Sequence, residues 1–318
     1  MKRYVKILAL FLALITVAFS SLTAFADEPN YSKAISNVGK KLSAYKFDGT
    51  AVCAARVAGV KINAPALERY SNSAAKSDDF KYVAEEVVNL SAAGKDVGNI
   101  YGADLVKKLD TLSVSALAVS DSAKKSELSS YALLALNAVN SDGENITRAA
   151  LCDTLVTYLS TAPAENAKLT ALCAAALTSK NAELLPAGTA DILKSIINDE
   201  KSESVSVSLS VIALVASNTA ATPEARTELY NCIMRYKTDS GSFSFTADSG
   251  HDEKSSQLAA LALFSLEKGV SPFAEENLPA LRFQSTFPVY LALALLGVGL
   301  ILILIGSIIT SKNHKQKV

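Results

Sequence analysis

The sequence contains no tryptophan and only two histidines, so residues typical of metal sites and of stacked aromatic clefts are scarce. His251 is the only histidine outside the last ten residues, and no cysteine lies near it in sequence. Phosphate-binding glycine loops, zinc-protease motifs and serine-nucleophile motifs are missing as well. The sequence therefore predicts no metal ligand, no cofactor and no catalytic residue, although an active site assembled from distant positions stays open.

Cysteine is also sparse, and its spacing matches no zinc site and no Cys-x-x-Cys redox motif. Each cysteine lies in a stretch rich in alanine, leucine and valine, where a thiol commonly serves as a small buried apolar group. We therefore expect free buried thiols, with two disulfides as the alternative for an exported chain. The four positions are Cys53, Cys152, Cys173 and Cys232.

Acidic residues are absent from both ends of the chain. All 31 acidic residues lie between Asp27 and Phe287, whereas three of the 31 basic residues precede this part and three follow it. The part between carries 25 basic groups and a net charge of −6, which argues against a nucleic-acid partner, because binding to phosphates needs a concentrated cationic face.

The N-terminus has the order of a signal peptide. Lys2, Arg3 and Lys6 precede an apolar run over residues 7–19, and a small-x-small sequence follows that ends at Ala26. We expect cleavage after Ala26, so that residues 1–26 form a signal peptide. The alternative is an uncleaved anchor helix, for which the run is short.

A second apolar run lies near the C-terminus. Residues 289–309 hold no charged side chain and are long enough, at about 1.5 Å per residue, to cross a hydrocarbon layer. We predict a transmembrane helix over residues 287–310 and, from the lysines that follow, a cytoplasmic tail over 311–318. A cell-wall sorting motif is absent before this run. The chain is thus predicted to be a single-pass plasma membrane protein, with an outer domain over residues 27–269 and a juxtamembrane linker over 270–286.

The outer domain contains six similar apolar segments, rich in alanine, leucine, valine and serine. Each stops at glycine or asparagine, the residues that most readily take the left-handed conformation that ends a helix. Their mean spacing of 42 residues accommodates a pair of helices and two connections. The predicted ends are Gly59, Gly94, Asn140, Asn181, Asn218 and Gly269.

More polar segments lie between these ends and predict the second helix of each pair, facing water on one side. Asn63 and Thr222 are expected to cap two of these helices, because a proline suited to the first turn follows each. The alternating stretch 242–246 is predicted to be a loop that buries two rings. The expected polar helices cover 31–45, 65–75, 102–112, 146–160, 187–197 and 223–236.

Six hairpins with similar apolar helices could close into a ring, with an open solenoid as the alternative. At Tyr236–Gly269 (YKTDSGSFSFTADSGHDEKSSQLAALALFSLEKG) and Val87–Leu109 (VVNLSAAGKDVGNIYGADLVKKL) the chain resembles bacterial exported proteins with prenyltransferase and squalene-oxidase type repeats. These proteins are relatives of the terpenoid cyclases and protein prenyltransferases. The resemblance implies an all-α fold, an α6/α6 toroid of repeated helical hairpins.

The chain departs from the enzymes of that superfamily. It lacks the Asp-x-Asp-Asp acid of class II cyclases and the Asp, Cys and His zinc ligands of the protein prenyltransferases, and its lack of tryptophan depletes an aromatic lining. Asp78 and Asp79 are interpreted as helix-start and solvated charges rather than as a diphosphate site. Tyr131, Phe243 and Phe245 are candidates to line a central cavity, with core packing as the alternative.

The function predicted from these observations is that of a non-catalytic, surface-anchored toroid. It would present its rim or cavity to a protein partner or a small apolar ligand. Two alternatives stay open: an enzyme acting on an isoprenoid or similar lipid, and a carrier of a corrinoid or another small ligand.

Overall fold

The computed structural model describes residues 29–161, 166–284 and Leu296. Within these residues the chain forms twelve α-helices and two short strands, so the all-α prediction is confirmed. No helix among the described residues is both long and apolar enough to cross a membrane. The predicted signal peptide, cytoplasmic tail and, apart from Leu296, transmembrane helix lie outside the described residues.

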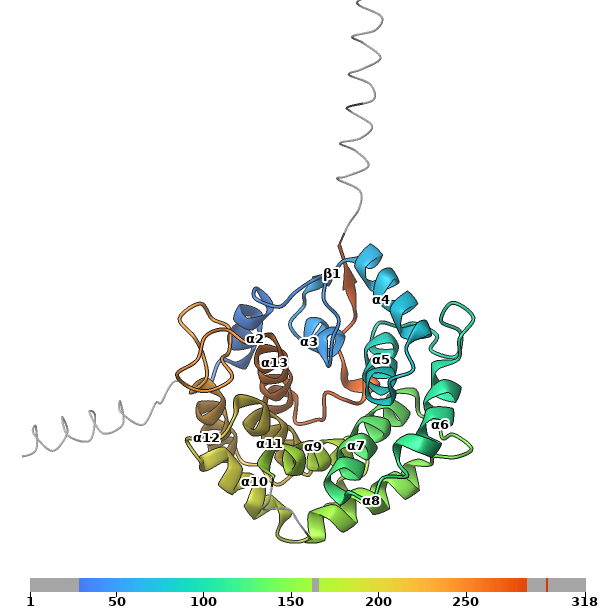
Figure 1. Cartoon of the computed structure of the whole chain (residues 1–318). Coiled ribbons are helices and arrows are strands. Elements are labelled where there is room, and N and C mark those ends of the chain that lie inside the picture. The colour runs from blue at the N-terminus through green and yellow to red at the C-terminus, as the bar shows by residue number, and fades with distance from the viewer. Residues whose placement is uncertain (1–28, 162–165, 285–295, 297–318) are drawn as a thin grey trace, which may run out of the picture.

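Six apolar helices pack side by side around the middle of the domain (Figure 1). Each contacts the next along the chain, and the last of them, α13, packs against the first, α3, so that the contacts form a closed circuit. We call these the inner helices: α3 (Ala51–Val57), α5 (Phe80–Ala92), α7 (Ser122–Val139), α9 (Ala167–Thr178), α11 (Ser204–Ala216) and α13 (Glu253–Lys268).

The more polar helices lie outside this circuit (Figure 1). The helix α2 packs on α13, α4 on α5, α6 on α5 and α7, α8 on α7 and α9, α10 on α11, and α12 on α13. We call them the outer helices: α2 (Tyr31–Gly39), α4 (Ala64–Lys76), α6 (Leu105–Ala116), α8 (Arg148–Thr161), α10 (Thr189–Asn198) and α12 (Pro223–Met234).

Composition explains which helices are inside. The helix α11 is made of serine, valine, leucine, isoleucine and alanine, and nearly all of its residues are buried, as expected of a helix with protein on every side. The outer helix α4 buries only Ala66, Leu67, Ser71 and Ala74, which recur every three to four residues and so occupy a single face. Two layers of helices with different patterning follow directly from the sequence.

Five of the six predicted helix ends take the left-handed conformation, with φ of 67° at Gly59, 69° at Gly94, 51° at Asn140, 57° at Asn218 and 74° at Gly269. Their prediction is confirmed.

The prediction for Asn181 is wrong. Its φ is −130°, and it precedes a short 3-10 helix, η1 (Ala182–Leu184), instead of ending α9 in a left-handed turn. The amide of Asn181 donates to the carbonyl of Leu177, and the amide of Ser179 donates to that of Ala176. Right-handed turns thus satisfy the last carbonyls of α9, so no left-handed residue is needed.

The caps of α4 and α12 are those predicted. The side chain of Asn63 accepts a hydrogen bond from the amide of Ala66 at 2.9 Å, and that of Thr222 accepts one from Ala225 at 3.2 Å. A proline follows in the first turn of each helix, where its missing amide hydrogen has no role.

The segment that follows α13 was predicted to be a linker, and residues 270–284 are instead part of the domain. Phe273, Ala274 and Leu278 are buried, and a short 3-10 helix, η2 (Glu275–Asn277), lies between them. The segment ends in β2 (Arg282–Phe283), which pairs in parallel with β1 (Lys61–Ile62). Its prolines and glutamates suggest a linker, but its apolar side chains fill space at the ends of the inner helices.

Arg56, on α3, forms hydrogen bonds to residues of the segment 270–284 and to the end of α5. Its guanidinium group donates to the carbonyls of Pro279 at 2.6 Å, Leu278 at 3.0 Å and Ala92 at 2.9 Å, and it lies 3.9 Å from a carboxylate oxygen of Glu275. Its side chain is only 11% exposed, and its bonds to Leu278 and Ala92 are partly buried, whereas the bond to Pro279 is exposed. One cation therefore satisfies three carbonyl groups at once.

Replacing Arg56 by alanine is expected to lower the free energy of unfolding by about 2–3 kcal/mol, because partly buried carbonyls lose a charged donor. Urea unfolding followed by circular dichroism measures this. Arg69→Ala on the exposed side of α4 is the matched control and should change stability by less than about 0.5 kcal/mol. Equal losses in the two variants would contradict the anchoring role of Arg56.

All four cysteines are free, as predicted. Cys53, Cys152 and Cys173 are buried, and Cys232 is partly exposed. Burial raises the pKa of Cys53 and of Cys173 to about 12, so both stay as thiols at neutral pH. These cysteines therefore act as small apolar packing groups.

Candidate functional site

A narrow cavity of about 50 Å³ lies between the inner helices. Five of these helices contribute two lining residues each, three or four positions apart, so each helix presents one face to the cavity. The pairs are Glu85 and Val88, Tyr131 and Leu134, Lys168 and Leu172, Val205 and Leu209, and Lys254 and Leu258. We call this cavity the shaft.

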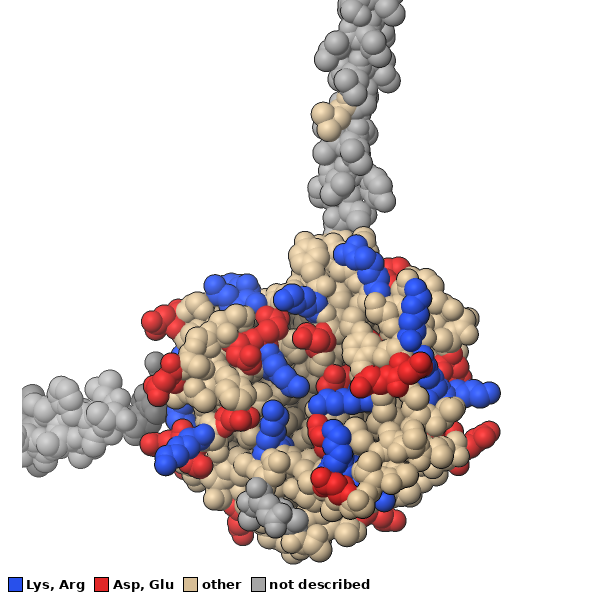
Figure 2. Space-filling model, in the orientation of Figure 1, with Lys and Arg blue, Asp and Glu red and all other residues tan. Residues whose placement is uncertain are grey.

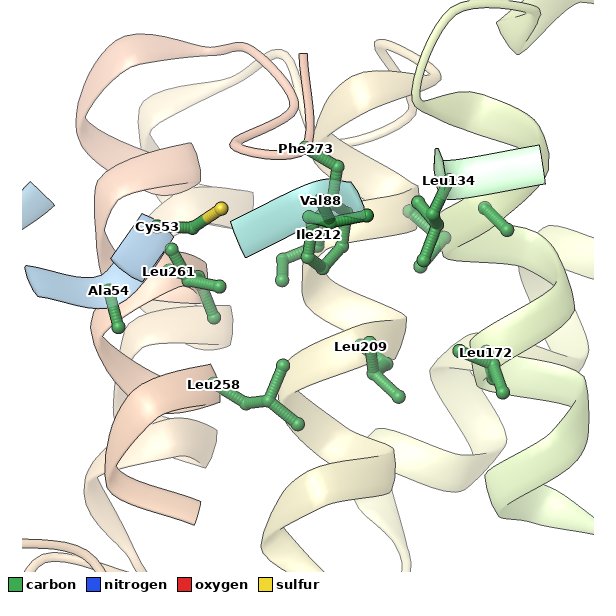
Figure 3. Close-up of a cluster of buried hydrophobic side chains, with 14 of the residues drawn as sticks. Cys53, Ala54, Val88, Leu134, Leu172, Leu209, Ile212, Leu258, Leu261 and Phe273 are labelled. Atoms are coloured by element: carbon green, nitrogen blue, oxygen red, sulfur yellow. The ribbon is translucent and has the colours of Figure 1, made fainter. Parts of the chain in front are cut away.

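The aliphatic residues form the deeper part of the shaft (Figure 3). Leu172, Leu209 and Leu258 lie at one level, and Val88 and Leu134 lie nearer the carboxyl ends of the helices. At that end stands Phe273, from the segment that follows α13. Phe273 is 3% exposed, so the shaft is closed there by an aromatic ring.

Polar residues surround the other end of the shaft, which we call the mouth. Tyr131, Lys168, Leu172 and Lys254 line both the shaft and a wider hollow of about 350 Å³ beside it, so the two spaces are continuous. The hollow is completed by residues from the amino ends of α5, α7 and α9, among them Lys81, Lys124 and Glu127. Figure 2 shows basic and acidic side chains interleaved around the hollow in the middle of this face.

Lysines occur at matching positions of three inner helices. Lys81, Lys168 and Lys254 are each the second residue of their helix, after the caps Asp79, Asn166 and Asp252. A cation in the first helical turn opposes the helix dipole, whose positive end lies there. Three amino ends and their lysines therefore produce a concentration of positive charge at the mouth, a setting that attracts anions.

Part of this charge is neutralised internally. Glu127 pairs with Lys81 and with Lys124 at 3.0 Å each, and Lys81 lies 4.4 Å from the centre of the Tyr131 ring. Burial raises the pKa of Glu127, but the two lysines outweigh this and hold it below its usual value.

The other two lysines are less engaged. Lys168 lies 3.9 Å from Glu203, which is a loose pair. Lys254 is near enough to Glu85 for its charge to counteract part of the rise that burial causes in the pKa of that carboxyl group. Lys168 and Lys254 are therefore the cations best placed to meet a ligand at the mouth.

Glu85 is the acidic residue that faces the shaft. Burial is the largest influence on its pKa and raises it, Lys254 and Lys81 oppose this, and the net effect is a raised pKa. A carboxyl group of this kind holds its proton more readily than one in water. A carboxyl group that lines an apolar space in this way is a candidate for proton transfer.

Of the three residues predicted to line a cavity, Tyr131 does so. Phe243 and Phe245 are not among the lining residues of the shaft. Phe243 is buried beside α13, where its amide donates to the hydroxyl of Ser256. Phe245 is 38% exposed, and its carbonyl accepts a hydrogen bond from the amide of Ser204 at the start of α11. The loop thus buries one ring and not two.

The other acidic and metal-ligating candidates lie apart from the shaft. Asp79 caps α5 by accepting a hydrogen bond from the amide of Tyr82 at 2.7 Å, and exposed Asp78 pairs with Lys108 at 3.1 Å. Both agree with the interpretation of these residues as helix-start and solvated charges. His251 lies on the α12–α13 loop, 3.5 Å from Glu253. Within the part of the chain that the structure describes, no three histidine, cysteine, aspartate or glutamate side chains gather into a metal-binding group.

Glu85, Lys168 and Lys254 were not identified from the sequence. The two lysines had a signal in the sequence, because a lysine in the first turn of a helix is electrostatically unfavourable and recurs at three equivalent helix starts, with Lys81 as the third. Only the closure of the inner helices reveals that the three starts face a common space.

No known family, curated protein or solved structure matches the chain.

Proposed function

We propose that this protein is a membrane-anchored α6/α6 toroid that binds a small amphipathic ligand without transforming it. The closed circuit of inner helices and the outer layer that covers it support the toroid, and so does the resemblance to exported prenyltransferase-type repeat proteins. The single observation that carries the binding function is an aliphatic shaft that is closed by Phe273 at one end and lined by lysines at the other.

The dimensions of the shaft support a slim ligand. A cavity of about 50 Å³ between leucine and valine side chains is too small for a corrinoid or a polycyclic isoprenoid and admits only the end of a single alkyl chain, whose remaining carbons would lie in the wider hollow. The polar part of the ligand would remain in the wider hollow, near Lys168 and Lys254. An anionic head fits this position better than a cationic one, because helix amino ends and lysines both contribute positive charge.

The lining supports binding more than catalysis. Thr50 lines the shaft and carries an aliphatic hydroxyl group, which would need a neighbouring base to act as a nucleophile. Its oxygen lies 3.5 Å from the side-chain amide oxygen of Gln257, and an amide is not a base. The one observation that favours an enzyme is Glu85, a partly buried carboxyl group with a raised pKa at the entrance to an apolar space. A lipid-transforming enzyme is therefore the second candidate, and turnover of an isoprenoid substrate would establish it.

Three eight-carbon probes that differ only in the head group test the binding proposal. We expect the full chain in lipid nanodiscs to bind octanoate most tightly, octanol less tightly and octylamine at least tenfold more weakly than octanoate, by isothermal titration calorimetry. Native mass spectrometry of the same sample reports any ligand retained from the cell and any converted probe.

Two phenylalanine substitutions localise the site. Leu209→Phe fills the shaft and should weaken octanoate binding at least tenfold. Leu193→Phe, at a fully buried position of α10 away from the shaft, is the matched control and should leave the affinity within twofold. Circular dichroism verifies that both variants fold. Undetectable binding of all three probes, or equal losses in the two folded variants, would overturn the proposal.

A further inference from the structure

The C-terminal end of the described domain is fixed at one point on its edge. The amide of Gln284 donates to the carbonyl of Ile62 at 3.0 Å, and its side-chain oxygen accepts from the side-chain amide of Asn63 at 3.1 Å. These bonds extend the parallel pairing of β1 with β2. The chain therefore leaves the domain beside β1, at the margin of the molecule in Figure 1.

Little chain separates this point from the predicted transmembrane helix. Two residues lie between Gln284 and position 287, and three fully extended steps reach at most about 10 Å. If residues 287–310 span a membrane, the edge that carries β1 must lie close to the lipid head groups. The juxtamembrane linker predicted over residues 270–286 would instead have held the domain away from the membrane.

Aromatic side chains are exposed on this edge. Phe283 is 47% exposed, and Tyr45 is 61% exposed although it lies far from β2 in sequence. The carbonyl of Ala44 accepts from the amide of Asn63 at 3.0 Å, which brings the Tyr45 loop beside β1. Aromatic rings at such positions are typical of the membrane–water interface.

Basic residues gather at the same edge, although the outer domain as a whole is acidic. Residues 29–63 contain six basic residues and a single acidic one, Asp48. Lys40, Lys41, Lys46 and Lys61 are exposed, as is Arg282, which approaches Gly59. Figure 2 shows basic side chains along the margin where Figure 1 places β1. This distribution complements a surface of anionic lipid head groups.

We propose that this edge rests on the anionic surface of the membrane that holds the C-terminal helix. We call it the membrane edge: Lys40, Lys41, Tyr45, Lys46, Lys61, Arg282 and Phe283. Because Figure 1 places β1 at the margin of the molecule and not over the middle of the inner helices, the domain meets the membrane with its side. The mouth of the shaft then opens along the membrane plane, and its ligand arrives from the aqueous side or from a neighbouring protein.

Fluorescence quenching in nanodiscs tests this orientation with the full chain. A bimane label is attached at Tyr45→Cys in a Cys232→Ser background, and the lipids carry a nitroxide on the head group. The matched control is Thr157→Cys, an exposed position on α8 on the opposite side of the domain in Figure 1. We expect at least twofold stronger quenching at position 45 than at position 157 in nanodiscs containing phosphatidylglycerol.

The contribution of the basic residues of the membrane edge is tested separately, by the quenching of the label at position 45. Replacing Lys40, Lys41 and Lys46 by glutamate should reduce quenching at position 45 to the value found in nanodiscs of phosphatidylcholine alone. This value should stay above that at position 157, because the short connection still holds the edge near the membrane. A label at Lys61→Cys provides a second reporter on the same edge. Equal quenching at 45, 61 and 157 would overturn the orientation, and quenching unaffected by charge reversal would overturn the role of anionic lipid. Neither result depends on ligand binding in the shaft.

Discussion

Replacing Phe273 by alanine is expected to lower the free energy of unfolding by about 3–5 kcal/mol, the usual range for a deeply buried aromatic ring. Phe273 is 3% exposed and closes the shaft at the carboxyl ends of the inner helices. Its neighbours belong to several different helices, so they cannot all move inward to fill the space that the ring leaves. The loss should therefore lie in the upper part of that range.

Urea unfolding of the full chain in nanodiscs measures the effect, with Phe245→Ala as the matched control. Phe245 is 38% exposed and is not among the residues that line the shaft, so its replacement should cost less than about 1 kcal/mol. The Phe273 variant should also bind longer alkyl chains better relative to shorter ones, because the closed end of the shaft is removed. Similar stability losses in the two variants would show that Phe273 does not close a packed core.

The helical layers could be predicted because their signals are local. An apolar stretch with a Gly or Asn at its end is visible in sequence, and Gly59 and Asn140 take the expected left-handed conformation. Asn181 fails because a right-handed turn can satisfy the same carbonyl groups, and the choice depends on the loop that follows. Local propensity thus specifies that a helix ends but not always how.

The segment 270–284 and the mouth of the shaft could not be predicted, because both depend on contacts distant in sequence. Phe273 looks like a linker residue until it is placed at the carboxyl ends of the inner helices, where it lines the shaft. Lys168 and Lys254 look like solvated charges until their two helices are placed around a common axis. Phe243 and Phe245 were assigned from their ring chemistry, but backbone bonds to neighbouring helices decide which ring is buried.

Glu86 produces the largest pH effect that we expect in the domain. It is fully buried, and neither of its carboxylate oxygens makes a hydrogen bond of good geometry among the described residues. Burial is the largest influence and raises its pKa, the nearby Tyr82 hydroxyl and Lys108 act in the opposite direction, and the result is about 8. The folded protein therefore holds this proton more tightly than the unfolded chain does.

The sign of the effect follows from proton linkage. Below the ordinary pKa of 4.5 both states bind the proton and there is no penalty, whereas between 4.5 and about 8 the unfolded chain releases it and becomes relatively more stable. Stability should thus fall as the pH rises through this window. A shift of this size corresponds to nearly 5 kcal/mol, and water that reaches the carboxylate as it ionises reduces the expected penalty to about 2–3 kcal/mol.

Glu86→Gln keeps the shape of the side chain and removes the titration, so it should stabilise the protein at pH 8 by about 2–3 kcal/mol and have little effect at pH 4.5. Urea unfolding at a series of pH values between 4.5 and 8.5 measures the difference. The control Glu228→Gln, at an exposed position of α12, should shift stability by less than about 0.5 kcal/mol throughout. A Glu86 variant whose stability runs parallel to that of the unaltered protein would show that the carboxyl group is already ionised in the folded state.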